Sequence, residues 1–215
     1  MGRIDYSLYL VTDRALARGR PLADVVRAAV AGGVTCVQLR EKEASAREFA
    51  AAARELLALL RPLGVPLIVN DRIDVALAAG ADGVHVGQQD LSVADARRLG
   101  PPGWIVGVSA ESVADAARAE RDGADYVGAS PIFATPTKTD HAPPLGLAGL
   151  RALRAATKLP LVAIGGLHAG NARETIRAGA DGLAVVSAIV AADDPRAAAA
   201  ELRREIAAAK GAEEK

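Results

Sequence analysis

The chain has 215 residues, and its 26 acidic and 26 basic side chains leave no net charge at pH 7. This balance excludes a general electrostatic attraction to nucleic acid or to an anionic membrane surface. Apolar residues make up 51% of the sequence but aromatic residues only 3%, so alanine supplies much of the apolar content. We therefore expect a large core in which thin, closely packed helices surround aliphatic strands.

The only cysteine, Cys36, lies in an apolar run. A single cysteine excludes an intrachain disulfide, and its position predicts a buried thiol in a reducing compartment. The sequence shows neither a basic-then-apolar leader nor an apolar run long enough to cross a bilayer. We expect a soluble cytoplasmic protein with neither a nucleic-acid nor a membrane partner. The sequence does not decide the oligomeric state, and a homo-oligomer is one possibility.

Short apolar runs without alternation predict strands that are covered on both faces. They lie at 8–12, 36–39, 67–70, 84–86, 105–109, 126–129, 161–164 and 183–186. Helical patterns separate them, at 22–31, 45–62, 73–79, 92–99, 112–121, 147–157, 169–178 and 195–209. Three of these helices open on a serine that is followed three residues later by an acid, which predicts a capped start: Ser45, Ser92 and Ser112.

The phrase Gly-Ala-Asp recurs at 80–82, 123–125 and 179–181, and residues 32–36 form a looser copy. Each copy follows an alanine-rich helical pattern and precedes a strand. Glycine can end a helix in the left-handed conformation that other residues adopt at a cost. The repeat therefore indicates one supersecondary unit that is used many times.

Eight strands that alternate with eight helices imply parallel strands joined by crossovers. A closed (βα)8 barrel, the TIM barrel, is the economical arrangement, and a doubly wound open sheet is the alternative. We expect a single domain over residues 1–215. A lid-like loop is expected at about 131–146, and a frayed tail from about residue 207.

In a barrel of this kind the active site lies where strands end and helices begin. Residues 38–42 (Gln-Leu-Arg-Glu-Lys) occupy such a position. Alternate strand residues share a face, so Cys36, Gln38 and Arg40 point the same way. Arginine can bind a phosphate through two parallel hydrogen bonds, and Lys42 adds a compact charge. The run therefore favours an anionic substrate, the alternative being a solvated charged loop.

Two acids, Asp71 and Asp90, follow neighbouring strands. Carboxylate oxygens suit Mg²⁺, which takes one or two protein carboxylates and completes its shell with water and phosphate oxygens. The same acids could equally cap helices or pair with Arg72. A nearby diphosphate-binding cluster would favour the metal.

Glycines 165–166 follow one strand, and Val186 and Ser187 follow the next. This order fits the phosphate site that the last two strand-helix loops of a barrel form. Thr135 and Thr137 in the long loop could donate hydroxyls to an anion, or could belong to an ordinary turn around Pro136. His85 is expected to pack in the interior. The sequence contains no Cys/His cluster, nucleophile elbow, Walker sequence or dinucleotide fingerprint.

Taken together and in order, these motifs resemble the thiamine phosphate synthase family, over almost the whole chain from Tyr9 to Ile189. The resemblance is carried by the segments 9–13, 38–42, 70–72, 83–90, 135–138, 163–166 and 186–189. It implies a (βα)8 barrel and a transferase of thiamine biosynthesis. In that family a hydroxymethylpyrimidine diphosphate and a thiazole phosphate, or its carboxylated form, are joined to give thiamine phosphate and diphosphate. Diphosphate leaves before the thiazole nitrogen attacks, so the reaction needs no protein nucleophile.

The resemblance also implies roles for individual residues. The pyrimidine diphosphate would contact Gln38, Leu39, Arg40, Glu41, Lys42, Asn70, Ser109 and Lys138. The thiazole phosphate would contact Thr135, Pro136, Thr137, Gly166, Val186 and Ser187. Mg²⁺ would be the cofactor, on Asp71 and Asp90. Arg40, Lys42, Ser109 and Lys138 would be catalytic.

Two alternatives remain at this point. One is a thiazole tautomerase on a similar barrel, which would need no group that binds diphosphate. The other is a noncatalytic barrel that binds phosphate. The acid pair and Lys138 argue against both, and magnesium-dependent release of diphosphate would separate the synthase from either.

Overall fold

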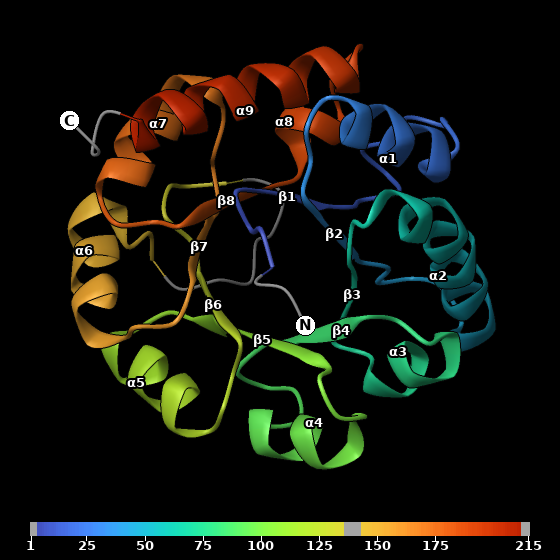
Figure 1. Ribbon diagram of the computed structural model, residues 1–215, viewed down its shortest axis with the longest axis horizontal. Helices are drawn as coiled ribbons and strands as arrows, with labels where there is room; N and C mark the ends of the chain where they lie inside the picture. Colours follow the sequence, from blue (N-terminus) through green and yellow to red (C-terminus); the bar gives the residue numbers. More distant parts are fainter. Residues whose placement is uncertain (1–3, 136–142, 212–215) are drawn as a thin grey trace.

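The computed structural model describes residues 4–135 and 143–211. In these ranges eight parallel strands close into a barrel in chain order, with β8 beside β1 (Figure 1). The strands are β1 (Leu8–Val11), β2 (Cys36–Leu39), β3 (Leu67–Asn70), β4 (Gly83–Val86), β5 (Ile105–Ala110), β6 (Tyr126–Ala129), β7 (Leu161–Ile164) and β8 (Gly182–Val185). The predicted barrel is confirmed, and the open sheet is excluded.

The helices form an outer ring around this barrel (Figure 1). They are α1 (Leu22–Ala31), α2 (Ala46–Leu60), the 3-10 turn η1 (Arg61–Leu63), α3 (Ile73–Ala79), α4 (Val93–Leu99), α5 (Val113–Arg121), α6 (Gly146–Ala156), α7 (Ala169–Arg177), α8 (Ser187–Val190) and α9 (Pro195–Lys210). The three predicted serine caps are confirmed, because each hydroxyl accepts a first-turn amide. The short helix α8 was not predicted.

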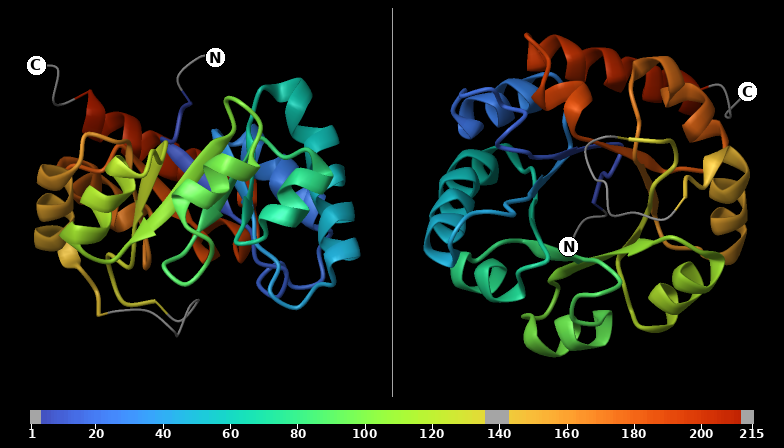
Figure 2. Two further views of the ribbon diagram at one scale, coloured as in Figure 1. Left: turned by 90° about the horizontal axis from the view of Figure 1, so that it is seen from below. Right: turned by 180° about the vertical axis from the view of Figure 1, so that it is seen from behind.

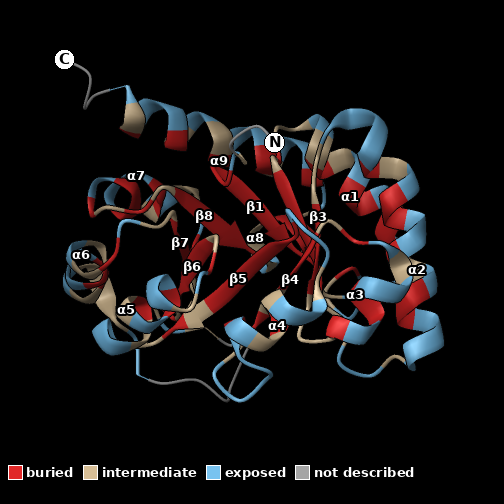
Figure 3. Cartoon of the chain, turned by 60° about the horizontal axis from the view of Figure 1, so that its bottom comes forward, coloured by how far each residue is buried: buried red, intermediate tan, exposed pale blue. Residues whose placement is uncertain are grey.

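Two apolar layers follow from the alternation of side chains along each strand (Figure 3). Val37 and Leu39 belong to the layer between the sheet and the helices. Cys36 belongs to the smaller cluster inside the barrel, and Gln38, one step further along the same face, is also buried. Burial raises the pKa of the Cys36 thiol. The prediction of a buried thiol is therefore confirmed.

The Gly-Ala-Asp repeats lie at the end of the barrel where strands begin. Their glycines have positive φ angles, as predicted, between 73° and 109°. Each aspartate accepts the backbone N–H of a residue in the preceding strand, Asp82 from Leu67 at 2.8 Å and Asp181 from Leu161 at 2.8 Å. Asp125 accepts from Val106 at 2.7 Å. The repeat thus joins each incoming strand to its neighbour.

The last helix closes the ring against the first. A Cβ on Gly32, at the end of α1, would lie 2.3 Å from the Arg196 carbonyl oxygen of α9, so the two helices approach as closely as the alanine content predicted. Helix α9 continues to Lys210, beyond residue 207, from which we expect the tail to fray. Ala209 is buried there, and the Lys210 ammonium donates to Ser7 Oγ at 2.9 Å. The end of α9 and the start of β1 therefore lie on the same face (Figure 2).

In the described ranges, no helix combines the length and the apolar character that a bilayer crossing requires.

Candidate active site

A cavity of about 480 Å³ opens at the end of the barrel where the strands stop. Strand ends all around the barrel contribute to its wall. Most of the predicted site residues line it: Gln38, Arg40, Lys42, Asn70, Asp71, Asp90, Ser109, Thr135, Gly166, Val186 and Ser187. Segments as far apart in the sequence as Gln38 and Ser187 therefore share one chamber.

Two predicted residues do not line this cavity. Leu39 points the other way and is fully buried between the sheet and the helices. Glu41 is turned toward Arg14 of the β1–α1 connection, whose guanidinium donates to it at 2.6 Å. These two side chains therefore lie outside the cavity that the other described site residues line. Pro136, Thr137 and Lys138 lie outside the described residues.

The two acids lie close together beside a lysine. The Lys42 ammonium donates to Asp71 Oδ2 at 2.8 Å, and Asp90 Oδ2 accepts the Gly87 N–H at 2.7 Å. The pKa of Asp90 is raised, first because the carboxyl is partly buried and also because the Asp71 carboxyl lies nearby. A cation beside the two acids would stabilise the charged form of Asp90.

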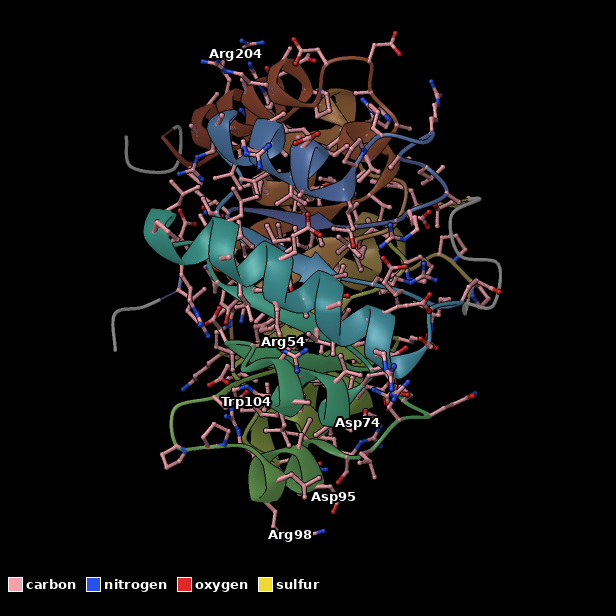
Figure 4. The ribbon with its side chains drawn as sticks, turned by 90° about the vertical axis from the view of Figure 1, so that its right-hand side faces the viewer. Arg54, Asp74, Asp95, Arg98, Trp104 and Arg204 are labelled. Carbon is pink, nitrogen blue, oxygen red and sulfur yellow. The ribbon has the colours of Figure 1, made fainter. Side chains whose placement is uncertain are left out.

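The alternative roles of these acids are excluded. Arg72 pairs with Asp74 at 2.5 Å, on the side of α3 seen in Figure 4, and not with Asp71 or Asp90. The first turn of α3 has no side-chain cap, and Ser92 caps α4. Neither Asp71 nor Asp90 therefore serves as a helix cap.

The backbone at Asp71 supports a functional role. Its φ angle is +62°, a conformation that costs energy for a residue with a Cβ. The Asp71 N–H donates to the His85 carbonyl of β4 at 2.8 Å, which holds this conformation. The strained turn directs the carboxylate toward Lys42 and Asp90.

This pair of acids fits Mg²⁺. The described residues contain no cluster of three or more potential metal-binding side chains of the His, Cys, Asp and Glu types. Mg²⁺ commonly uses one or two carboxylates and takes its remaining ligands from water and phosphate. Asp71 and Asp90 could therefore hold the ion only together with an oxygen-rich ligand in the cavity.

A chain of hydrogen bonds crosses the floor of the cavity. Gln38 Nε2 donates to the Tyr9 hydroxyl at 3.0 Å, and the hydroxyls of Tyr9 and Tyr126 lie 2.8 Å apart. His85 Nδ1 lies 2.9 Å from the Tyr126 hydroxyl, and His85 Nε2 lies 3.0 Å from Ser109 Oγ. The chain connects strands β2, β1, β6, β4 and β5, and it holds the two end groups, Gln38 and Ser109, in fixed positions.

Sequence reasoning missed Tyr9 and Tyr126, and for His85 it favoured interior packing over the role of a ligand. The interior position of His85 is confirmed, and the ring in addition lines the cavity and lies within hydrogen-bond distance of Tyr126 and Ser109. The available signal was that the sequence has only three tyrosines. A polar aromatic residue in a barrel strand needs a partner for its hydroxyl when it is buried.

On the opposite side of the cavity the backbone forms a cradle. Gly165 and Gly166 have φ angles of +102° and +65°. A Cβ on Gly166 would lie 2.8 Å from the Ala134 carbonyl oxygen and from Phe133 Cβ. Asn171 donates to the Gly166 carbonyl at 2.9 Å and so holds the turn. Helix α8 begins at Ser187, beside this turn at the cavity wall.

A phosphate site in barrels is commonly formed by the loops after strands seven and eight and by a short extra helix. This cradle has those three parts. With the cationic and acidic cluster across the cavity, the fold is a (βα)8 barrel whose cavity has two sides of the kind that bind anionic groups in barrel enzymes.

Comparison with known proteins gives the family. The model of the family described as thiamine monophosphate synthase matches residues 8–189. A thiamine-phosphate synthase of Albidiferax ferrireducens is 64% identical over 197 residues, which are 92% of this chain and 90% of the relative. The enzyme of the same name from Chloroflexus aurantiacus is 58% identical over 200 residues, 93% of this chain and 92% of that one.

A solved structure agrees with these sequence matches. The thiamine phosphate pyrophosphorylase from Pyrococcus furiosus is 40% identical and superimposes with a TM-score of 0.88, over 96% of this chain and 98% of that one. The chain belongs to the thiamine monophosphate synthase family. It is a transferase of thiamine biosynthesis that forms thiamine phosphate, so the predicted family, fold and activity are confirmed.

Proposed function

We propose that the cavity joins a hydroxymethylpyrimidine diphosphate to a thiazole phosphate, with or without a carboxylate, by a magnesium-dependent dissociative substitution. The observation that carries this proposal is that one cavity has charged side chains on one side and a glycine turn with a helix start on the other. Lys42, Asp71 and Asp90 lie on one side, and Gly166 and Ser187 on the other. Two substrates that each carry a phosphorylated group can therefore bind face to face.

The diphosphate side would use the ends of β2 to β5. Arg40, which is only partly exposed, would bind diphosphate oxygens together with Lys42. Asn70 and Ser109 would donate to the same substrate, and Gln38 would hold it from the floor. Mg²⁺ on Asp71 and Asp90 would neutralise charge that develops on the leaving diphosphate.

With the uncarboxylated thiazole phosphate, the reaction breaks one C–O bond and forms one C–N bond. A carboxylated substrate would in addition lose CO2, and the electron pair of that C–C bond would stay on the thiazole carbon, which takes up a proton. The electron pair of the C–O bond leaves with the diphosphate, and the thiazole nitrogen then supplies its lone pair to the cationic pyrimidinylmethyl carbon. Arg40 and Lys42 would stabilise the departing charge, while the cavity walls hold the two reactants in line. No protein nucleophile is required.

The thiazole phosphate would bind the cradle formed by Gly166, Val186 and Ser187. Thr135, which lines the cavity beside them, would add a hydroxyl. Pro136 and Thr137 would complete this site and Lys138 would meet the diphosphate, roles that rest on the family resemblance alone. We further propose that the reaction takes place in the cytoplasm, and the buried Cys36 thiol supports this location. The partners of the protein are then its small-molecule substrates. The proposal holds equally for a monomer and for a homo-oligomer.

The proposal is tested by measuring thiamine phosphate formation and pyrimidine diphosphate binding across a Mg²⁺ titration. Asp71→Asn and Asp90→Asn should each shift the titration to higher Mg²⁺, both in rate and in calorimetric affinity. Asp74→Asn is the matched control, because it removes a nearby acid that pairs with Arg72 outside the cavity. Unchanged Mg²⁺ dependence in both cavity variants would exclude the metal assignment.

A further inference from the structure

We propose that Arg20 is a positioning residue for the thiazole phosphate, although it does not line the cavity, and that it acts through helix α8. The inference rests on the proposed function, because it concerns the phosphate side of the same site. It is supported by two hydrogen bonds from the Arg20 guanidinium to backbone carbonyls that lie 170 and 172 positions further along the chain.

Arg20 lies in the β1–α1 connection and is partly buried. Its guanidinium donates to the Val190 carbonyl at 2.5 Å and to the Ala192 carbonyl at 2.7 Å. Its Nε donates to the Ala17 carbonyl at 3.0 Å, which holds the side chain from its own loop. Arg20 is thus anchored at one end and bridges to the end of α8 at the other.

Helix α8 needs such a contact because it has only four residues, Ser187–Val190. A helix this short is not stable by itself, and its last carbonyls have no partners within the helix. The planar fork of arginine suits two neighbouring carbonyl oxygens. Arg20 therefore satisfies orphan acceptors and fixes the direction of α8, together with the buried side chains of Ile189 and Val190.

Helix α8 connects the two places: Arg20 binds its last residue, and its first residue faces the cavity. At a rise of about 1.5 Å per residue, α8 is roughly 6 Å long, so it moves as one piece. Ser187 at its start lines the cavity beside Gly166. Loss of the fork would let Val186 and Ser187 shift relative to the glycine turn and would loosen the cradle.

The chain offers two controls for this inference. Arg154 also binds backbone carbonyls, those of Thr157 and Leu159, but at the opposite end of the barrel. Arg18 belongs to the same turn as Arg20, yet its only described contact to the α8 side is an exposed ion pair with Asp193 at 3.8 Å. Arg154 controls for lost stability, and Arg18 controls for lost charge near α8.

The experiment measures kcat, the KM of each substrate and the melting temperature for Arg20→Gln, Arg20→Lys, Arg154→Gln and Arg18→Gln. Arg20→Gln should raise the KM of the thiazole phosphate by about tenfold and leave the KM of the pyrimidine diphosphate unchanged, because misplaced binding groups lose affinity only for the ligand they hold. Arg20→Lys keeps the charge but not the fork, so its thiazole phosphate KM should also rise. If Arg20→Gln is not recovered folded, Arg20→Lys carries the test.

Three results would overturn the role of Arg20. They are an equal rise in both KM values, a similar rise in Arg154→Gln or Arg18→Gln, and a normal thiazole phosphate KM in Arg20→Lys. Gly166→Val separates this failure from a failure of the proposed function. If Gly166→Val keeps its affinity for thiazole phosphate, the phosphate site lies elsewhere and the proposed function fails at this point. If Gly166→Val loses this affinity but Arg20→Gln keeps it, only the positioning role of Arg20 is excluded.

Discussion

The two ends of the barrel use aspartate in opposite ways. Where the strands begin, Asp82, Asp125 and Asp181 each accept a backbone N–H from a neighbouring strand. Where the strands end, Asp71 and Asp90 lie near each other, and the pKa of Asp90 is raised by burial and by the Asp71 charge. The same type of side chain therefore stabilises the fold at one end, and at the other it forms the acid pair that we propose as the Mg²⁺ site.

The difference comes from what surrounds each carboxylate. A backbone amide is held in place by the sheet and compensates a carboxylate permanently. Asp90 also accepts a backbone amide, from Gly87, and Lys42 donates to Asp71, but the pKa of Asp90 is still raised by burial and by the Asp71 carboxyl, so a further cation would stabilise the pair. The predictions below test this contrast.

The largest effect is expected at the acid pair. Asp71→Ala and Asp90→Ala should each lower kcat/KM by on the order of a hundredfold or more, because charge stabilisation of the leaving group is lost. Their melting temperatures should not fall. Steady-state assays at limiting Mg²⁺ measure this effect. Asp74→Ala is the control and should keep the wild-type rate. Near-normal turnover in either cavity variant would contradict the assignment.

A smaller and more selective effect is expected across the cavity. Gly166→Val should weaken thiazole phosphate binding by at least about tenfold, because a Cβ meets the 133–134 backbone and the φ angle of +65° disfavours valine. Pyrimidine diphosphate binding should persist. Separate calorimetric titrations of the two ligands in Mg²⁺ check this. Equal loss of both would indicate a damaged barrel instead.

The other end of the barrel should respond in stability alone. Asp125→Ala leaves the Val106 N–H without its acceptor, which should lower the free energy of unfolding by about 1–3 kcal/mol. The kcat of the folded protein should not change. Urea denaturation and initial rates at 25 °C measure the two quantities, and a drop in kcat with full stability would reverse the contrast.

The smallest effect is a pH dependence at Asp90. Its pKa in the folded protein is raised above the ordinary value of 3.8, so the folded state holds this proton more tightly than the unfolded state. The wild type therefore loses stability as the pH rises from about that value through the raised pKa. Without Mg²⁺, Asp90→Asn should melt above the wild type at pH 7, and the difference should vanish below the ordinary pKa.

Added Mg²⁺ should reverse that order at pH 7, since only the wild type keeps both carboxylates. Melting curves across pH with and without Mg²⁺ provide the measurement. A difference between the two proteins that stays constant at every pH would show that Asp90 ionisation has no part in it.

The sequence alone determined the order and most boundaries of the elements. The predicted spans 22–31, 36–39, 67–70, 73–79, 126–129 and 161–164 match the structure residue for residue. Apolar runs, serine caps and glycine stops act within a few residues, so they can be read locally. The sequence also predicted that Lys42, Asp71 and Asp90 lie at the same end of the barrel, because parallel strands bring their carboxyl ends to one face.

Only the tertiary structure decided which of these residues meet. Tyr9 and Tyr126 are 117 positions apart, and closure of the barrel brings their hydroxyls to 2.8 Å. Glu41 pairs with Arg14 and does not line the cavity. Arg20, which lies before the first helix, donates to the end of α8 near the end of the chain. Such contacts depend on how the closed sheet places distant strand ends side by side, a geometry that no local pattern of side chains encodes.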